Sequence, residues 1–315
     1  MRNVTRAAIA GLAVFAGAAV AQAADPETCR TVRFADVGWT DITSTTALTS
    51  AMLAGLGYQP TDQILSVPVT YASLKNEDID VFLGNWMPTM EADLRPFVDD
   101  GSVEVVEPAN LEGAKYTLSV PTYTFDAGLK SFQDIATFHD QLGGKIYGIE
   151  PGNDGNRLIL DMIAADQFGL GGFELVESSE QGMLAQVARA TSRNEPIVFL
   201  GWEPHPMNAN FAMSYLAGGD DVFGPDFGGA TVFTNVRAGY LDECPNAGAL
   251  IGKLRFTLAM ENEVMAAILD GGKEPAAAAT DWLKSNPDAW AGWLDGVTTF
   301  DGQPGLDAVK AHLGM

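Results

Sequence analysis

Three tryptophans stand at equivalent places in the sequence, each shortly after an apolar run. Trp39 follows the run that ends at Val37, Trp86 follows the sequence DVFLG, and Trp202 follows PIVFLG. The face of an indole ring attracts a cation held within ~6 Å by roughly 0.5–2 kcal/mol for each ring. A quaternary ammonium group has no N–H to donate, so methyl contacts and this attraction must recognise it. The three residues therefore predict an aromatic cage for a choline-like cation.

Core packing is the alternative role for each tryptophan, because large aromatic side chains commonly fill protein interiors. Three tryptophans in one topological position favour binding over packing. Trp282, Trp290 and Trp293 serve as a comparison, since they fall in a helical C-terminal segment and the last two are about one helical turn apart. We interpret these three as core residues without a ligand role.

Two polar residues are candidates for the hydroxyl end of such a ligand. Asp41 follows Trp39 by two residues and would either cap the next helix or face the ligand, where its charge favours choline over a carboxylate such as glycine betaine. Asn153 lies in the glycine-rich loop 151–156, which lacks the spacing of a nucleotide-binding motif. We therefore expect Asn153 to make one hydrogen bond to the ligand, and Asp154 makes an anion still less welcome.

Carboxylates beside a tryptophan-rich cleft also fit an exported glycoside hydrolase, in which two carboxyl groups do the chemistry. Asp41, Glu150 and Glu203 follow or end predicted strands, so such a pair is conceivable. However, the sequence contains no GxSxG or HExxH motif and three histidines, of which His205 lies between two prolines and is expected to be a structural loop residue. We therefore favour a binding protein over an enzyme and expect no cofactor and no metal.

The elements that would position these residues alternate along the chain. Extended runs are predicted at residues 31–37, 63–69, 80–84, 103–106, 116–120, 145–150, 173–176 and 197–201. Helices are predicted at 45–56, 71–77, 132–138, 156–168, 181–191, 245–270, 274–284 and beyond 287. Strands separated by helices of this length predict an α/β protein with parallel sheets. Residues just past the carboxyl ends of parallel strands line the ligand crevice, which is where we place the three tryptophans.

Two stretches punctuated by glycine and proline, at 111–116 and 222–230, interrupt this alternation. We interpret them as chain crossings between two lobes, because a chain of this length usually splits into two domains. The first lobe would hold residues 24–115 and 225–315, and the second would hold residues 116–224. The first lobe is therefore expected to be discontinuous.

The N-terminus has the composition of an export signal. Arg2 and Arg6 precede an apolar run at 7–20, and the sequence AQA at 21–23 has the small-x-small pattern of a signal-peptidase site. We predict cleavage after Ala23 and a periplasmic location. The net charge is −23, or −25 without the two arginines of this leader, and so acidic a chain is repelled by nucleic acid and anionic membranes.

The chain has two cysteines, Cys29 and Cys244. In an exported protein the usual expectation is one disulfide, which would close a loop of 215 residues and contribute roughly 5 kcal/mol in the chain-entropy model. Two free thiols are the alternative. Zinc is not expected, because two cysteines and three scattered histidines offer no ligand spacing.

Four segments resemble the periplasmic choline-binding proteins of ABC importers, within the wider glycine betaine/choline class of substrate-binding proteins. The segments are GWTD at 38–41, LGNWMP at 83–88, EPGNDGN at 150–156 and GWEPHPM at 201–207. The resemblance covers essentially the whole mature chain. It implies a two-lobed periplasmic binding protein of the type II-like fold, each lobe a mainly parallel sheet flanked by helices, with the ligand in the interlobe cleft.

The resemblance also implies the site and the partners. The implied site residues are Trp39, Asp41, Trp86, Tyr116, Asn153 and Trp202, with Tyr123 as the alternative to Tyr116. Choline is the expected ligand, with acetylcholine, glycine betaine and carnitine as alternatives. The expected partner is an ABC permease in the inner membrane, the chain is expected to be a monomer, and its two cysteines would pair as the family's do.

Such a protein works by closure of its lobes around the ligand, which stabilises the closed form through contacts made only there. We expect Trp39 and Trp86 to come from one lobe and Asn153 and Trp202 from the other. A sensor that feeds a chemoreceptor would use the same fold and pocket, so the sequence leaves transport and sensing both open.

Overall fold

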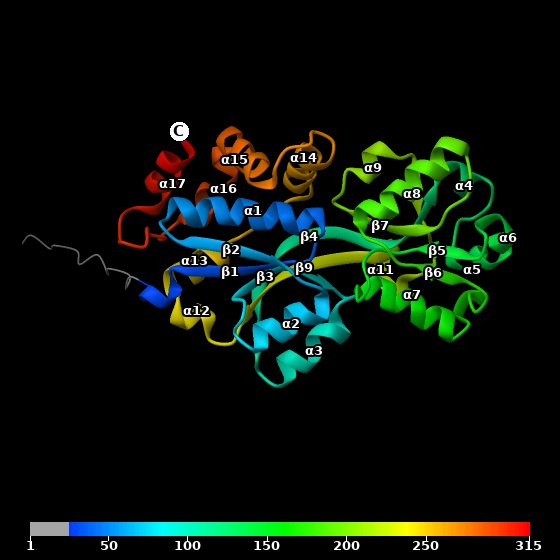
Figure 1. The fold of residues 1–315 in the computed structure, drawn as a ribbon, viewed down its shortest axis with the longest axis horizontal. Coiled ribbons are helices and arrows are strands. Elements are labelled where there is room, and N and C mark those ends of the chain that lie inside the picture. Colours follow the sequence, from blue (N-terminus) through cyan, green and yellow to red (C-terminus); the bar gives the residue numbers. More distant parts are fainter. Residues whose placement is uncertain (1–24) are drawn as a thin grey trace, which may run out of the picture.

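The computed structural model describes residues 25–315, so the predicted leader lies outside the described residues. Figure 1 shows two lobes that lie end to end along the long axis of the molecule. The strands are β1 (Thr31–Asp36), β2 (Gln59–Ile64), β3 (Val81–Met87), β4 (Val103–Pro121), β5 (Lys145–Tyr147), β6 (Glu174–Val176), β7 (Phe199–Glu203), β8 (Met213–Tyr215) and β9 (Gly229–Arg237).

Helices surround this sheet in both lobes (Figure 1). The α-helices are α1 (Thr40–Gly55), α2 (Val67–Lys75), α3 (Glu91–Asp99), α4 (Thr122–Asp126), α5 (Phe132–Ile135), α6 (His139–Leu142), α7 (Asp154–Ala164), α8 (Glu180–Arg193), α9 (Met207–Asn210), α10 (Asp220–Phe223), α11 (Pro225–Gly228), α12 (Tyr240–Glu243), α13 (Pro245–Ile251), α14 (Leu258–Leu269), α15 (Pro275–Ser285), α16 (Pro287–Trp290) and α17 (Gly305–Leu313). The 3₁₀ helices are η1 (Glu27–Cys29), η2 (Ala136–Phe138), η3 (Gln167–Gly169) and η4 (Ala291–Leu294). None of these helices in residues 25–315 has the length and apolar character needed to cross a membrane.

One mixed sheet runs through both lobes in the order β2-β1-β3-β9-β4-β7-β5-β6, and β8 pairs with β4. Pairing is parallel at both ends, among β2, β1 and β3 and among β7, β5 and β6. It is antiparallel in the middle, where β9 and β4 lie. The predicted two-lobed α/β architecture is confirmed, and the lobes share one continuous sheet because two long strands link them.

Those two strands, β4 and β9, carry the chain between the lobes. We call β1–β3 with α1–α3 and α12–α17 the first lobe, and β5–β8 with α4–α9 the second lobe. β4 pairs with β9 from Val103 to Lys115 and with β7 from Lys115 to Ser119. Its register on β9 shifts on both sides of Leu111. β4 is therefore a single strand in which the predicted runs 103–106 and 116–120 are two parts.

The strand predicted at 63–69 is wrong. β2 ends at Ile64, and α2 begins at Val67 after the N-cap residue Ser66, with Pro68 in its first turn. Proline suits the first turn of a helix because its fixed φ is helical and its missing N–H would be unpaired there. β2 itself is an edge strand with a mostly exposed, polar sequence, so no apolar alternation marks it.

Other elements also differ from the sequence prediction: β8 and α3 are not among the predicted elements, and the helix predicted at 245–270 is divided into α13 and α14. β9 was not predicted, although alternate residues are buried over Gly229–Val232 and beyond, because glycine, threonine and asparagine dilute its apolar pattern. α1 begins at Thr40, five residues before the predicted start. Its first two turns are rich in threonine and serine, which have modest helix propensity, and burial rather than propensity holds them in the helix.

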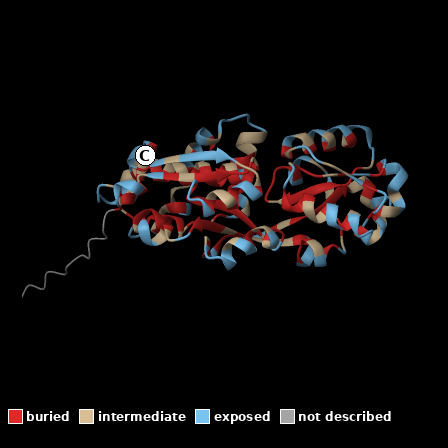
Figure 2. Cartoon of the chain, turned by 60° about the horizontal axis from the view of Figure 1, so that its bottom comes forward, coloured by how far each residue is buried: buried red, intermediate tan, exposed pale blue. Residues whose placement is uncertain are grey.

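The buried residues follow the sheet in both lobes, and exposed residues cover the outer faces of the helices (Figure 2). The predicted disulfide between Cys29 and Cys244 is confirmed, with the two Cα atoms 5.6 Å apart and a sequence separation of 215. It joins η1 to the residue between α12 and α13, both in the first lobe. The bond therefore fixes the start of the described chain to a late segment, away from the second lobe.

Candidate ligand-binding site

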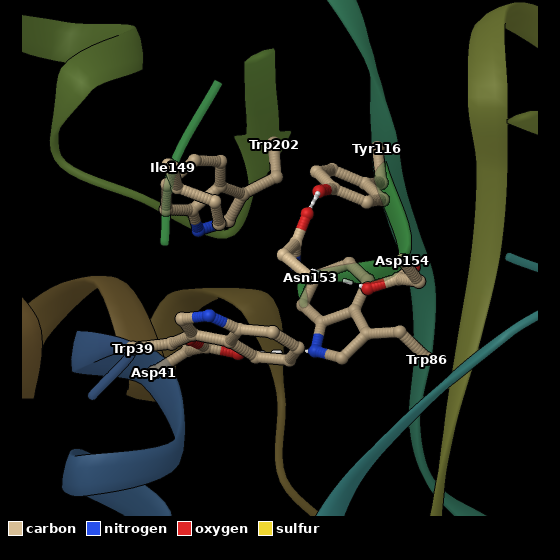
Figure 3. Close-up of a pocket in the computed structure, with 8 residues that line it drawn as sticks. All are labelled: Trp39, Asp41, Trp86, Tyr116, Ile149, Asn153, Asp154 and Trp202. Carbon is tan, nitrogen blue, oxygen red and sulfur yellow. Dashed lines mark hydrogen bonds between the residues drawn. The ribbon is translucent and has the colours of Figure 1, made fainter. Parts of the chain in front are cut away.

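A small cavity lies where the two lobes meet (Figure 3). The residues that line it are Trp39, Asp41, Trp86, Tyr116, Ile149, Asn153, Asp154 and Trp202. Each is at most 5% exposed, so the lobes are closed around the cavity. The structure brings together all six residues that the sequence analysis named as ligand-binding residues. Their contact with a ligand stays a prediction.

The first lobe contributes Trp39, Asp41 and Trp86. Trp39 follows β1 as the N-cap residue of α1, and Asp41 is the second residue of that helix rather than its cap. Trp86 is the next-to-last residue of β3. β1 and β3 are neighbouring parallel strands, so their carboxyl ends bring the two tryptophans to the same edge of the sheet.

The second lobe contributes Trp202 opposite Tyr116. Trp202 is the next-to-last residue of β7, and it is paired in register with Tyr116 of β4. The two ring centroids are 6.3 Å apart, and the Tyr116 centroid is 6.1 Å from that of Trp86. Tyr116 thus joins the tryptophans of both lobes. Tyr123 lies on α4 and donates a hydrogen bond to the carbonyl of Glu195, outside the lining set.

Asn153 is held in one orientation by its neighbours. It is the N-cap residue of α7, and its Oδ1 accepts hydrogen bonds from the Asn156 N–H at 3.1 Å and from the Tyr116 hydroxyl at 2.8 Å. Its Nδ2 donates to Oδ1 of Asp154 at 3.0 Å. Since an amide nitrogen carries two hydrogens, the second hydrogen on Nδ2 is available to an oxygen atom of a ligand.

The cavity is acidic and has no lysine or arginine in its described lining. Burial raises the pKa of Asp41 to about 8, and the charge on Glu180 adds to this effect. Burial likewise raises the pKa of Asp154 to about 6 and that of Glu150, which lies beside the cavity, to about 7. Among residues 25–315, none of these three carboxyl groups forms an ion pair, although the charge on Arg157 lowers the pKa of Asp154 slightly, so a bound cation would favour their ionised forms.

Hydrogen bonds cross the cleft around this cavity. The indole Nε1 of Trp39, in the first lobe, donates to Oε1 of Glu150 at 2.7 Å. The guanidinium of Arg157 on α7 donates to Oδ2 of Asp93 at 2.7 Å and to the carbonyl of Thr89 at 3.1 Å. Such bonds form only when the lobes approach each other, and so they stabilise the closed form.

Of the three carboxyl groups considered for a hydrolase, only that of Asp41 lines the cavity. Asp41 lines it, Glu150 is bonded to Trp39, and Glu203 ends β7 outside the lining residues. In residues 25–315, no group of three or more His, Cys, Asp or Glu side chains is arranged to hold a metal ion. The geometry is that of an enclosed binding site.

Two lining residues were absent from the predicted site. The sequence places Ile149 inside the predicted run 145–150, whereas β5 ends at Tyr147 and leaves Ile149 just past its carboxyl end. Asp154, the residue after Asn153, was noted in the sequence only as a group that repels anions. Ile149 lies in the connection between β5 and α7, and Asp154 is the first residue of α7, so this part of the chain forms one side of the second-lobe wall of the cavity.

Comparison with known proteins gives a consistent result. Residues 30–285 match the family OpuAC, described as the substrate binding domain of ABC-type glycine betaine transport system. A solved ABC-transporter choline binding protein in complex with choline is 64% identical, with a TM-score of 0.91 over 92% of this chain and 100% of that chain. Lactococcal OpuAC, in a closed-liganded conformation with glycine betaine, is 25% identical, with a TM-score of 0.75 over 84% of this chain and 98% of that chain.

Sequence comparison adds a curated relative. The glycine betaine/carnitine transport binding protein GbuC of Listeria monocytogenes is 34% identical over 130 residues, which make up 41% of this chain and 42% of that protein. The matched region thus spans less than half of that relative.

Proposed function

Because this chain belongs to the family of substrate-binding domains of ABC-type glycine betaine transport systems, we propose that it captures choline between its lobes and delivers it to the permease of an ABC importer. One observation carries the choice of ligand: three tryptophans and a tyrosine surround a closed cavity, and the buried carboxyl group of Asp41 in it has an oxygen without a hydrogen-bond partner among residues 25–315. The similarity to a solved choline complex supports the same choice.

The aromatic lining is suited to the trimethylammonium group. Its positive charge is spread over methyl groups that cannot donate hydrogen bonds, so aromatic faces bind it with little loss of hydration. A primary ammonium would need hydrogen-bond acceptors for its three N–H groups, and the lining carboxylates of the described residues offer two oxygens without a hydrogen-bond partner, Oδ1 of Asp41 and Oδ2 of Asp154. The cage therefore selects quaternary ammonium compounds over amines.

The polar end of the cavity favours an alcohol over a carboxylate. A hydroxyl group can accept a hydrogen bond from Nδ2 of Asn153 and donate one to a carboxylate oxygen of Asp41. The carboxylate of glycine betaine would instead lie near Asp41 and Asp154 with no lysine or arginine in the lining. Like charges in a buried site repel strongly, so we propose that choline binds more tightly than glycine betaine and carnitine.

Glycine betaine is the second candidate, because the family description and the lactococcal relative both concern it. The raised pKa values of Asp41 and Asp154 favour it to some extent, since a protonated carboxyl group can donate a hydrogen bond to a ligand carboxylate. Below about pH 8 Asp41 already holds this proton, so glycine betaine would bind the protonated site, whereas choline would bind the ionised one.

We further propose how the chain is organised and where it acts. The lobes would divide at residues 115/116 and 224/225, with β4 and β9 as the hinge. The leader would be removed after Ala23, and the mature chain would act in the periplasm as a monomer, without catalysing a reaction. Choline would stabilise the closed form through contacts with both lobes.

Calorimetric titration of the mature protein tests the ligand. We expect choline to bind at least about tenfold more tightly than glycine betaine, which corresponds to roughly 1.4 kcal/mol. Acetylcholine and carnitine, titrated in the same buffer, extend the comparison to a longer cation and to a second carboxylate. Tighter binding of glycine betaine would replace choline as the ligand, and no binding of any of the four would contradict the proposal.

A further inference from the structure

The start of α1 lacks a cap from its own lobe. Trp39 is the N-cap residue, and its side chain makes no capping hydrogen bond. The first N–H groups of a helix have no partner within the helix and need one from elsewhere. Thr40, the first residue of α1, lies between the two cavity residues Trp39 and Asp41, so whatever satisfies its N–H also positions them.

Glu180, the first residue of α8 in the second lobe, supplies that partner. Its Oε2 accepts the backbone N–H of Thr40 at 2.8 Å, and its Oε1 accepts the Thr40 hydroxyl at 2.5 Å. Glu180 is 1% exposed and Thr40 is 4% exposed. The carboxylate therefore caps a helix of the opposite lobe, in a contact that exists only when the cleft is closed.

The same carboxylate is connected to the cage on its own side through His205. The backbone N–H of Met207 donates to Nδ1 of His205 at 2.9 Å, so the ring proton is on Nε2, which faces Oε1 of Glu180 at 3.2 Å. The His205 ring packs edge-on against Trp202, with 4.9 Å between the centroids. A buried chain of contacts thus runs from Trp202 through His205 and Glu180 to Thr40.

We infer that Glu180 is a positioning residue of the binding site, which locks the N-terminus of α1, and with it Trp39 and Asp41, against the second lobe on closure. This inference rests on the proposed function. According to this inference, Glu180 contributes to the affinity for the ligand although it does not line the cavity.

The charge of Glu180 also links closure to a cationic ligand. Its three described hydrogen-bond donors are a backbone amide, a hydroxyl and an imidazole, and no lysine or arginine among residues 25–315 forms an ion pair with it. Closing the cleft without ligand therefore buries a carboxylate without a counter-charge, which is unfavourable. A quaternary ammonium in the neighbouring cavity supplies positive charge, so closure is favoured when the ligand is present.

The test compares Glu180→Gln and Thr40→Val with the wild type and with the control Glu91→Gln. Glu91 is the first residue of α3 and is paired with Arg95, so the control removes a first-turn helix carboxylate outside the cleft. Three quantities are measured for each protein: the Kd and dissociation rate of choline, and the Tm without ligand.

We expect both variants to raise the Kd of choline. Glu180→Gln removes the charged acceptor and should raise the Kd by about 10- to 100-fold, whereas Thr40→Val removes one hydroxyl donor and should raise it by less. The increase should appear in the dissociation rate, because the lock forms after the ligand has entered. The Tm without ligand should stay near the wild-type value, and Glu91→Gln should bind choline normally.

Other outcomes overturn the inference. Wild-type affinity in both cleft variants, or a lower Tm with unchanged affinity per folded molecule, would make Glu180 an ordinary structural residue. If Glu180→Gln does not fold, Thr40→Val decides, because it removes one bond of the lock from the other lobe. A wild-type protein that binds no choline would contradict the proposed function itself, and this result is distinct from the others.

Discussion

The indole Nε1 of Trp86 donates a hydrogen bond to Oδ2 of Asp41 at 3.1 Å, and Oδ1 of the same carboxyl group has no partner among the described residues. One residue of the cage therefore fixes the carboxyl group that faces the cage (Figure 3). The arrangement couples the aromatic and the charged parts of the site, so that substitution of either residue should alter both affinity and selectivity.

Asp41→Asn should weaken choline binding by about 10- to 100-fold, because a charge-assisted contact in a buried site is replaced by a neutral one. The affinity of the variant for glycine betaine should fall by less or should rise, because the repulsion between Asp41 and the ligand carboxylate is removed. Titration of both ligands measures the change in their ratio. Asp307→Asn, in the first turn of α17 and exposed, is the matched control, and an unchanged choline/betaine ratio in Asp41→Asn would refute the role given to Asp41.

The aromatic cage should discriminate by charge and not only by shape. 3,3-Dimethylbutan-1-ol has the shape of choline without its charge, and four rings at 0.5–2 kcal/mol each predict binding at least about thirtyfold weaker than that of choline. Trp202→Leu should reduce this preference, whereas Trp282→Leu should not, because Trp282 is bonded to Glu263 outside the cavity. Equal binding of the two compounds by the wild type would exclude a cation–π cage.

Choline affinity should rise with pH. The pKa of Asp41 in the closed, ligand-free protein is about 8, raised from 3.8 by burial and by the charge on Glu180. Protons and choline compete for this carboxyl group, so the Kd should fall by up to about tenfold per pH unit between pH 6 and 8. Glu150 and Asp154 add to the slope below about pH 7, because burial raises the pKa of each.

The stability of the ligand-free closed form should change in the opposite direction over the same range. Between pH 4 and 8 the folded protein holds a proton on Asp41 that the unfolded chain has released, so this contribution to stability is lost as the pH rises. Buried Glu261, whose pKa is raised by burial and by the charge on Asp41, acts in the same sense. Thermal unfolding and titration from pH 5 to 8 check both slopes, and a pH-independent Kd would show that Asp41 is ionised throughout.

The cage residues could be found from the sequence because short buried strands are locally encoded. The apolar sequence VFLG occurs at residues 81–84 and 198–201, and the tryptophan that follows each, Trp86 or Trp202, is placed by topology. In the structure Trp86 and Trp202 are the next-to-last residues of their strands rather than residues beyond the strand ends. The predicted strands end two or three residues too early, and both side chains still lie at the edge that faces the cleft.

Contacts between distant residues could not be predicted in this way. Thr40 and Glu180 are 140 residues apart, and no local pattern indicates that one caps the helix of the other. The sequence does not predict β9, because its pairing with β3 and β4, rather than its composition, defines it as a strand. The sequence thus predicts which residues reach the cleft, whereas closure determines which of them meet.

Removal of the disulfide should reduce stability and leave binding intact. In the chain-entropy model, a loop of 215 residues corresponds to about 5 kcal/mol of the free energy of unfolding. Both cysteines lie in the first lobe, outside the cavity lining. Urea unfolding of the Cys29→Ser, Cys244→Ser double variant should therefore show a loss of about 3–5 kcal/mol, with the Kd of choline within about twofold of wild type. A large change in Kd would instead show that the disulfide shapes the cleft.

Gly155 leaves space for the Tyr116 ring, and its replacement should weaken choline binding without unfolding α7. It is the second residue of α7, and a Cβ atom there would lie 2.7 Å from Cζ of Tyr116, closer than any ordinary contact. Alanine is favoured over glycine in a helix by about 1 kcal/mol, so Gly155→Ala should keep α7 while it displaces the Tyr116 ring and its hydrogen bond to Asn153. We expect the Kd of choline to rise at least about tenfold, roughly the loss of one ring and one hydrogen bond. Gly292→Ala, where a Cβ would have no neighbour within 4 Å, should bind normally. If Gly155→Ala also binds normally, the Tyr116 ring has space to move, and its place in the cage does not determine affinity.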